Sequence, residues 1–190
     1  MKVSNLIILG PQGSGKDTQA DLLAKKFGYK VIDTGTALRE IAKEDTSLGR
    51  RVKATIDAGQ MVEPELATEV IRAYLSELNA GEKVIVVGYP RGIEQYSLLK
   101  QTWPKLGRGN FLTVYIDITD EEATKRLMLR AEKEGRADDT LEAIKKRLSW
   151  SRAVVDPMVS EMEKEGKLIR IDGAPSVEKV HDEIVKRLEL

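Results

Sequence analysis

Short runs of β-branched and aliphatic residues alternate along this chain with longer segments whose apolar residues recur at every third or fourth position. The short runs show no strict alternation of apolar and polar residues, as is typical of strands that are buried on both faces. Helical segments between such strands favour an α/β fold, in which crossover helices cover both faces of a parallel sheet. The five predicted strands span residues 3–9, 29–32, 83–88, 111–117 and 168–171.

The segments between these runs predict helices. Apolar residues at helical spacing indicate one helix around residues 20–27 and another around residues 177–188. Residues 35–79 contain helical patterns and no strand pattern, so we expect a helical excursion from the core rather than a separate domain.

Residues 139–166 predict one long helix with an interruption. Asp139 and Glu142 have the spacing of a capping pair at its start. Pro157 lies inside the segment, and proline removes a backbone donor and clashes with the preceding helical turn. We therefore expect the helix to be bent or broken near Asp156.

The composition is that of a single globular domain. The chain has 190 residues, 31 basic and 31 acidic side chains, and no cysteine. A net charge of zero gives no bias towards nucleic acid, and the apolar runs are too short to cross a bilayer. The lack of cysteine excludes thiolate metal sites and agrees with a reducing compartment, and no signal-peptide pattern opens the chain. We expect a cytoplasmic protein with no nucleic-acid or membrane partner; the sequence leaves the oligomeric state open.

A glycine-rich loop follows the first predicted strand and precedes the first predicted helix. Its sequence, Gly10-Pro11-Gln12-Gly13-Ser14-Gly15-Lys16, matches the Walker A pattern G-x-x-x-x-G-K. Glycines allow successive backbone N–H groups to point at phosphate oxygens, while the helix N-terminus and the lysine add positive charge. The pattern predicts a cradle for the β- and γ-phosphates of a nucleotide, in a P-loop NTPase-type three-layer fold.

Arginine residues favour a phosphoryl-transfer enzyme over other P-loop proteins. Two phosphate-bearing substrates that meet end to end need cationic groups beyond a single lysine. Arg91 follows the third predicted strand, at the sheet edge where open α/β folds bind ligands. Six arginines lie in segments that can face this edge: Arg39, Arg91, Arg126, Arg130, Arg136 and Arg147.

The chain resembles the short-lid form of the adenylate kinase family over essentially its whole length. The matching motifs, in family order, are residues 10–19, Thr34-Gly35 with Arg39, Gly59-Gln60-Met61-Val62, Gly88-Tyr89-Pro90-Arg91 with Gln95, Thr124-Lys125-Arg126-Leu127 with Arg130, Gly135-Arg136-Ala137-Asp138-Asp139, and Lys146-Arg147-Leu148. The resemblance implies the reversible reaction of ATP and AMP to two ADP, with Mg²⁺ as cofactor.

The resemblance also implies where the substrates bind. It implies ATP binding by Gly13, Ser14, Gly15, Lys16, Asp17, Thr18, Arg126, Arg130 and Gly173, with Arg126 stacking on the base. It implies AMP binding by Thr34, Gly35, Arg39, Met61, Val62, Gly88, Arg91, Gln95, Arg136 and Arg147. The implied catalytic residues are Lys16, Arg91, Arg130, Arg136 and Arg147.

Three parts of the chain are distinguished by the same resemblance. Residues 1–33, 64–130 and 140–190 form the core, residues 34–63 a mobile AMP-binding insertion, and residues 131–139 a short lid loop. We expect both mobile parts to close on the substrates and exclude water.

Gln95 bears on the choice of acceptor. An amide side chain both donates and accepts hydrogen bonds, which suits the edge of adenine. The related pyrimidine kinases carry an Asn-rich stretch directly after the arginine, whereas this chain has Gly92-Ile93-Glu94-Gln95. We therefore favour AMP; a UMP/CMP kinase or a kinase of broad acceptor specificity is the alternative.

Three positions depart from the family pattern. Val87 stands where the family usually has the Asp that holds Mg²⁺ through water, and Thr36 stands where it usually has another Asp, beside an unusual Asp33. Asp17 replaces the glycine that usually follows the loop lysine, at the position where other NTPases place a Mg²⁺ ligand. We hypothesise that Asp17 organises the metal; the alternative is an acidic residue that favours the helix dipole. A nucleotide-binding module with little catalysis is a further alternative, against which the retained arginines argue.

Three other conspicuous residues are interpreted as packing residues. His181 lies on the apolar face of the last predicted helix. Trp103 and Trp150 occupy helical positions and are interpreted as core or edge packing rather than as platforms for a base.

Overall fold

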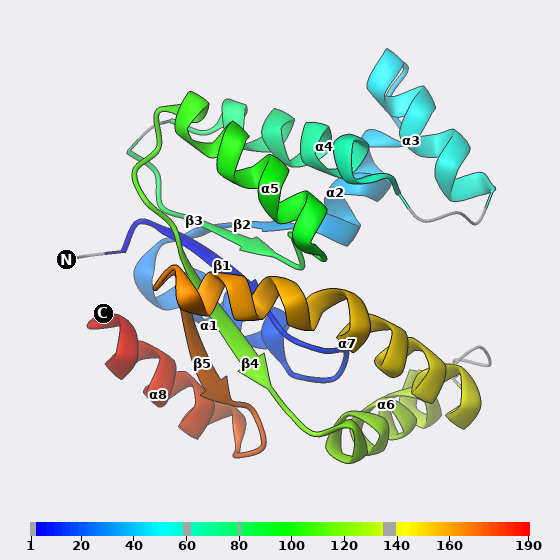
Figure 1. The fold of residues 1–190 in the computed structure, drawn as a ribbon, viewed down its shortest axis with the longest axis vertical. Helices are drawn as coiled ribbons and strands as arrows, with labels where there is room; N and C mark the ends of the chain where they lie inside the picture. Colours follow the sequence, from blue (N-terminus) through cyan, green and yellow to red (C-terminus); the bar gives the residue numbers. More distant parts are fainter. Residues whose placement is uncertain (1–2, 59–61, 80, 135–139) are drawn as a thin grey trace.

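The computed structural model describes residues 3–58, 62–79, 81–134 and 140–190 and shows a three-layer α/β fold (Figure 1). Five parallel strands in these ranges form one sheet in the order β2-β3-β1-β4-β5. The five predicted strands and the predicted parallel sheet are confirmed. The strands are β1 (Asn5–Leu9), β2 (Lys30–Asp33), β3 (Val84–Val87), β4 (Leu112–Asp117) and β5 (Leu168–Asp172).

Helices connect consecutive strands, and one more follows the last strand. They are α1 (Lys16–Phe27), α2 (Thr34–Ile41), α3 (Ser47–Asp57), α4 (Pro64–Glu77), α5 (Ile93–Thr102), α6 (Asp120–Glu134), α7 (Leu141–Lys164) and α8 (Val177–Leu188), with a 3₁₀ turn η1 (Trp103–Leu106). The two helices predicted from periodicity are confirmed as α1 and α8. No helix in the described ranges is long and apolar enough to cross a membrane.

The two faces of the sheet are buried against different helices. Ile7 and Val86 belong to a core cluster with residues of α2, α4, α5 and α7. Leu6 and Ile85 belong to a second cluster with residues of α1 and α8, on the opposite face. Because neighbouring strand residues point to opposite faces and both faces are covered, β1, β3 and β4 are buried along most of their length, whereas the edge strands β2 and β5 are partly exposed.

The helical excursion between β2 and β3 shares the main core. Ala37 of α2 and Val52 of α3 are buried in the same cluster as the strand residues. The described part of residues 35–79 is helical and contains no strand, as predicted. The excursion therefore has no separate core within the described residues.

Helix α7 is one continuous helix, as predicted, so of the bend or break expected near Asp156 the break is wrong. It runs through Pro157, and buried residues lie on both sides of the proline. Leu148 packs with α6 before it, and Met158 and Met162 enter the main core after it. Burial on both sides outweighs the roughly 3 kcal/mol that an internal proline costs a helix. The cap is Thr140, whose hydroxyl accepts from the Ala143 N–H at 3.2 Å, and the predicted capping residue Asp139 lies outside the described residues.

The order of the strands brings two chain segments together at one edge of the sheet. The connection from β1 leads to one side of the sheet and the connection from β3 leads to the other, so a switch point lies between them. Val87 pairs with Ile8, and the Gly88 N–H donates to the Ile8 carbonyl at 3.2 Å. The loop after β1 and the loop after β3 therefore start side by side.

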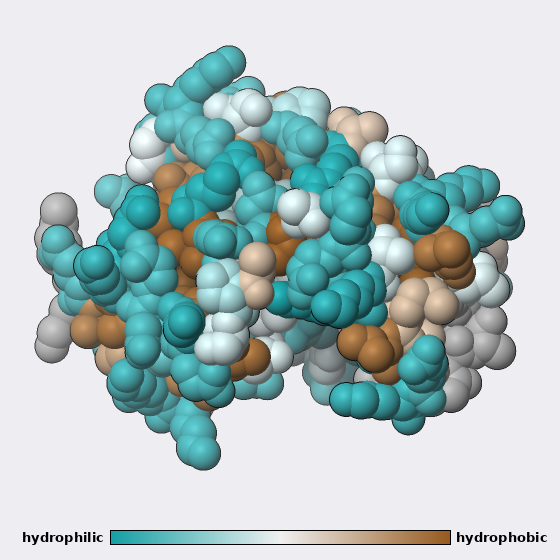
Figure 2. All heavy atoms as spheres, turned by 90° about the horizontal axis from the view of Figure 1, so that it is seen from below, coloured by the Kyte–Doolittle hydropathy of each residue, from teal (hydrophilic) through white to brown (hydrophobic). Residues whose placement is uncertain are grey.

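The surface carries few large apolar residues. The face shown in Figure 2 is mostly hydrophilic, with apolar residues in several small groups rather than one patch. Single exposed apolar residues of this kind are normal on a protein surface. This face offers no extended apolar surface.

Candidate functional site

The glycine-rich loop between β1 and α1 has a backbone that side chains would disturb. Gly13 and Gly15 have φ angles of +83° and +84°, in the left-handed region. A Cβ atom at Gly10 would lie 2.4 Å from the Ile116 carbonyl oxygen and 2.6 Å from Ser14 Oγ. Helix α1 follows directly at Lys16 without a side-chain cap, so the first N–H groups of the helix are left for a ligand or water. The loop has the form expected for an anion cradle.

Side chains at the start of α1 differ in exposure. Lys16 is mostly covered, with 18% of its side chain exposed, whereas the Asp17 side chain is 69% exposed. Lys16 Nζ lies 3.7 Å from Asp17 Oδ2, a loose ion pair. Thr18 is exposed as well, and Ser14 is buried. The cation at Lys16 is therefore beside the loop and only weakly neutralised by its neighbour.

Arg126 links α6 to the loop and to the segment after β5. Its Nη1 donates to the Gly13 carbonyl at 3.3 Å, and its Nη2 donates to the carbonyls of Gly173 and Ala174 at 2.9 Å and 3.2 Å. Nε donates to Glu122 at 2.7 Å. These bonds all use the edge of the guanidinium group, so its flat face is the part that remains for stacking. Gly13, Arg126 and Gly173, three of the residues implied for ATP, are thus brought together.

Glycine is required at position 173 because neighbouring atoms leave no room for a side chain, and not because its φ angle is unusual. Its N–H donates to the Asp117 carbonyl at 2.8 Å. A Cβ atom there would lie 2.6 Å from the Ile116 Cγ2 atom. The segment after β5 can therefore reach the guanidinium of Arg126 only with glycine at this position.

The other arginines of the donor side lie on α6 and α7. Arg130 and Arg147 are both half-buried, beside the small apolar cluster that Leu127 and Leu148 form between the two helices. Arg136 lies outside the described residues.

A cavity of about 740 Å³ opens beside Arg91, and we call it the Arg91 cavity. Residues of α2, of the start of α4, of the segment 88–95 and of α7 form its walls. Five of the residues implied for AMP line it: Thr34, Val62, Gly88, Arg91 and Gln95. Gly35, Arg39 and Arg147 are not among its lining residues, and Met61 lies outside the described residues.

Hydrogen bonds hold the polar wall of the Arg91 cavity in place. Arg91 Nε donates to the Gly88 carbonyl at 2.7 Å, and the Thr34 hydroxyl donates to the Val87 carbonyl at 2.6 Å. The Arg91 N–H donates to Gln95 Oε1 at 2.7 Å. The amide oxygen of Gln95 is therefore occupied, and its NH₂ group is the part that can donate to a ligand.

Tyr89 connects two walls of the same cavity. Its hydroxyl donates to the Gln95 carbonyl at 3.2 Å and lies 2.7 Å from the Thr68 hydroxyl of α4. Burial raises the pKa of Tyr89 to about 12, so the phenol stays protonated near neutral pH and keeps this link.

The start of α2 explains the unusual acidic residue at position 33. Asp33 caps α2 by accepting from the Thr36 N–H at 2.8 Å. Arg39 is exposed and donates to the Thr36 hydroxyl at 3.0 Å, so it is turned towards its own helix. The carboxylate of Asp33 is thus engaged in holding the helix that forms one wall of the Arg91 cavity.

Trp150 is a residue whose role the sequence analysis missed. It is 50% exposed and lines the Arg91 cavity, so of the predicted alternatives, core or edge packing, core packing is wrong. The signal was its spacing with Ala153, Val154 and Pro157, which repeats at helical intervals and puts all four on one face of α7. Trp150 is exposed because the apolar face of α7 is wider than the part of it that packs against the core.

Trp103 and His181, in contrast, are packing residues as predicted. Trp103 is 3% exposed and donates from Nε1 to the Gly109 carbonyl at 2.8 Å. His181 is buried beside Gln19, with Nδ1 3.2 Å from Oε1, and burial lowers its pKa.

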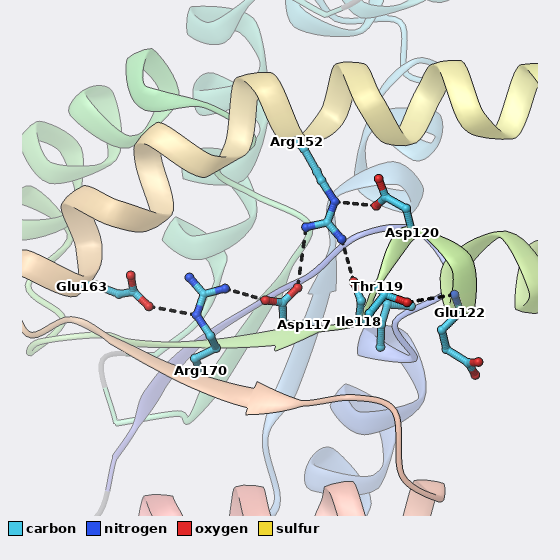
Figure 3. A network of polar contacts seen from close by, with 8 residues as sticks. All are labelled: Asp117, Ile118, Thr119, Asp120, Glu122, Arg152, Glu163 and Arg170. Atoms are coloured by element: carbon cyan, nitrogen blue, oxygen red, sulfur yellow. Dashed lines mark hydrogen bonds and ion pairs between the residues drawn. The ribbon is translucent and has the colours of Figure 1, made fainter.

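A network of charged residues fastens α7 above the carboxyl ends of β4 and β5 (Figure 3). Arg152 contacts Asp120 and Asp117 and donates to the Ile118 carbonyl at 2.6 Å. Arg170 of β5 donates to Asp117 at 2.6 Å and to Glu163 at 3.0 Å. Arg152 stands two residues after Trp150, so the network fixes the part of α7 that borders the Arg91 cavity.

Metal ligands are sparse in the site. Within the part of the chain that the structure describes, no three acidic, His or Cys side chains come together as a metal-binding group. Val87 is 1% exposed and offers only its backbone carbonyl, which accepts from Thr34. Asp17 and Thr18 are the exposed oxygen-bearing side chains directly after the loop lysine.

Known proteins are similar to this chain over a range that includes both the phosphate loop and the Arg91 cavity. A family model described as adenylate kinase matches residues 8–167. A protein named adenylate kinase from Phocaeicola vulgatus is 35% identical over 185 residues, which cover 97% of this chain and 98% of that protein. Proteins of the same name from Leptospira biflexa and Thermus thermophilus are each 36% identical, covering 98% and 94% of this chain and 100% and 94% of their own.

Proposed function

Because the chain belongs to the adenylate kinase family, whose members are nucleoside monophosphate kinases, we propose that its preferred reaction is the reversible transfer of a phosphoryl group from ATP to AMP. The observation that carries this proposal is the position of the Arg91 cavity beside the phosphate loop. Lys16 and Arg91 follow the neighbouring strands β1 and β3, which pair directly. Two phosphate groups bound there meet end to end at the edge of the sheet.

The donor nucleotide binds at the phosphate loop in this proposal. The backbone N–H groups of residues 13–18 and Lys16 hold its phosphates. The flat face of Arg126 supports the adenine, because the edge of that guanidinium is already bonded to Gly13, Gly173 and Ala174. Arg130, Arg136 and Arg147 complete the charge compensation around the transferring group.

The acceptor nucleotide binds in the Arg91 cavity. Arg91 takes its phosphate, and the apolar residues Leu38 and Val62 contact its base. Arg39, which does not line the cavity, would reach the phosphate only when residues 34–63 close. The NH₂ group of Gln95 donates to a ring nitrogen of adenine, since its amide oxygen is held by the Arg91 N–H. No catalytic base is needed, because the attacking phosphate oxygen is already anionic and positioning suffices.

Closure of two segments over the substrates is part of the proposal. Residues 34–63 would move towards the acceptor and residues 131–139 towards the donor, which excludes water from the transferring phosphoryl group. The cytoplasm, which supplies both ATP and AMP, is the proposed location.

Magnesium fits a site of this kind although the chain offers few ligands. Mg²⁺ in phosphoryl-transfer sites usually keeps several waters and is bound by substrate phosphates with one or two protein oxygens. The exposed side chains of Asp17 and Thr18 after the loop lysine suit that role, and the apolar Val87 does not. When bound, the ion neutralises charge on the donor phosphates.

The role of Asp17 can be tested by substitution. Replacing Asp17 with Gly removes the carboxylate and should raise the Mg²⁺ concentration for half-maximal turnover by about five-fold or more, because one protein ligand is lost. Asp21→Gly, an exposed position one turn further along α1, serves as the control. An unchanged Mg²⁺ dependence in Asp17→Gly would end the idea that this residue organises the metal.

The acceptor proposal is tested by a nucleotide panel. Formation of nucleoside diphosphates is measured with ATP and with GTP as donors against AMP, GMP, CMP and UMP, with Mg²⁺ titrated. The proposal expects the highest kcat/KM for AMP. A preference for CMP or UMP would identify a pyrimidine kinase instead, and nucleotide binding without turnover would identify a binding module.

A further inference from the structure

The Trp150 indole is a large apolar ring, and exposing such a ring to water is unfavourable in free energy. With half of its surface exposed, it has the largest exposed fraction among the large hydrophobic residues of the described chain. It belongs to none of the three apolar clusters, although residues of the same helix contribute to two of them. A single exposed apolar side chain is normal on a protein surface, so the position of this indole in the molecule decides whether it has a role.

The helix places Trp150 on a wall of the Arg91 cavity. Trp150, Ala153, Val154 and Pro157 line the cavity from one face of α7. A Cβ atom at Gly92 would lie 3.1 Å from Val154 Cγ1, so α7 abuts the segment that carries Arg91 and Gln95. Ile93 is 44% exposed and also lines the cavity, which gives this side an apolar mouth.

Two sets of ion pairs hold α7 in its position beside the Arg91 cavity. Arg152 is bound to Asp117 and Asp120 on one side of α7. Lys100 of α5 contacts Glu161 and Glu165 at 2.8 Å and 2.7 Å, which ties the far ends of α5 and α7 together. The indole therefore stands on an element that is fastened to both neighbouring walls rather than on a free loop.

We propose that Trp150 is a specificity-determining residue, whose indole stacks on the base of the acceptor nucleotide and favours purine over pyrimidine monophosphates. The polar groups of the cavity can bind the phosphate and one edge of the base, but they provide no flat surface. An aromatic side chain provides one, and stacking grows with the area of the base. The inference rests on the proposed acceptor site and adds Trp150 as a residue that distinguishes bases by their size.

Fluorescence gives a readout that does not depend on turnover. In the wild-type protein, AMP should quench the tryptophan emission at the lowest concentration, and GMP should quench it at a somewhat higher one, because its protonated N1 cannot accept from the Gln95 NH₂ group. CMP and UMP should need about ten-fold more, because a pyrimidine covers less of the indole. Trp150→Phe retains Trp103, which is buried and hydrogen-bonded to Gly109, so the quenching should disappear in this variant. Quenching that persists in Trp150→Phe would overturn the proposal.

Kinetics separate stacking from a merely structural role. Trp150→Ala should raise the KM for AMP about ten-fold while the KM for ATP and kcat change less than about two-fold. Trp150→Phe should restore most of the AMP affinity, because a benzene ring still stacks. Leu141→Ala removes a similarly exposed apolar side chain from α7, outside the cavity, and should change neither KM. An unchanged KM for AMP in Trp150→Ala, or an equal rise in the KM for ATP, would contradict the stacking role.

The two proposals fail in different ways. If wild-type protein forms no ADP from ATP and AMP, the proposed function is wrong, and the fluorescence titration with the four monophosphates still decides whether Trp150 stacks on a base. If wild-type protein is active and Trp150→Ala has normal AMP kinetics, the proposed function stands and the inference about Trp150 is wrong.

Discussion

The phosphate loop and the Arg91 cavity lie side by side, but they are built in different ways. The loop consists of seven consecutive residues whose shape depends on glycines with positive φ angles. The Arg91 cavity collects residues from Thr34 to Pro157, on four helices and the loops before α4 and after β3, and its shape depends on hydrogen bonds and helix packing. The phosphates of all nucleotides are alike, so backbone N–H groups suffice for them, whereas bases differ and must be distinguished by side chains.

This difference predicts that substitutions in the two regions affect different kinetic constants. Changes at the loop should reduce turnover with every acceptor alike. Changes in the Arg91 cavity should alter the choice and affinity of the acceptor and leave the use of the donor nearly constant.

The largest expected effect belongs to the loop lysine. Lys16→Ala should lower kcat by about 10²–10³-fold with every accepted monophosphate, because a cation that stabilises the transferring charge is lost. Steady-state ADP formation measures the effect, and thermal unfolding checks that the fold is kept. Lys25→Ala, at an exposed position of α1, is the matched control. Near-normal activity of Lys16→Ala would contradict the donor-site assignment.

An intermediate effect is expected at Gln95. Gln95→Glu keeps an oxygen that accepts from the Arg91 N–H but replaces the NH₂ donor. It therefore retains the hydrogen bond to the loop and removes only the hydrogen bond proposed for the base. The ratio of kcat/KM for AMP to that for CMP should fall about ten-fold, which corresponds to losing a hydrogen bond to the base. Gln101→Glu, an exposed position on the same helix, controls for the added charge. An unaltered ratio would remove Gln95 from base recognition.

The smallest effect concerns the ion pairs that tie α5 to α7 at the far end of the Arg91 cavity. Hydrogen bonds from Lys100 and Tyr96 lower the pKa of Glu165 from 4.5 to about 2. A lowered pKa in the folded state means that the carboxylate stabilises the fold above about pH 4.5 and that this contribution is lost as the pH falls towards 2. Glu165→Gln should therefore lower the free energy of unfolding by about 1 kcal/mol or less at pH 7, because the pair is partly exposed.

Urea unfolding of wild-type and Glu165→Gln protein at pH 7, 5 and 3 measures this difference. The difference between the two stabilities should shrink from pH 5 to pH 3, and the KM for ATP should be equal in both proteins. A difference that stays constant from pH 7 to pH 3 would show that the charge of Glu165 is not what stabilises the contact.

Much of the fold could be predicted from the sequence because the relevant signals are local. Residues buried on both faces mark β1, β3 and β4 within a few positions, and the glycine pattern between β1 and α1 defines the loop without reference to the rest of the chain. Of the bend or break that Pro157 predicts in α7, the break was wrong for the same reason. The cost of Pro157 is local, whereas the burial of Leu148 and Met158 that outweighs it involves other helices.

Local sequence patterns establish the phosphate loop, the order of the strands and the residue types available to a nucleotide. The packing of distant segments establishes that the Gln95 oxygen accepts from the Arg91 N–H, that Asp33 caps α2, and that Trp150 lines a cavity rather than the core. A local pattern depends on a few neighbouring residues. The surroundings of a side chain depend on how whole helices are rotated against the sheet, and packing between distant segments sets that rotation.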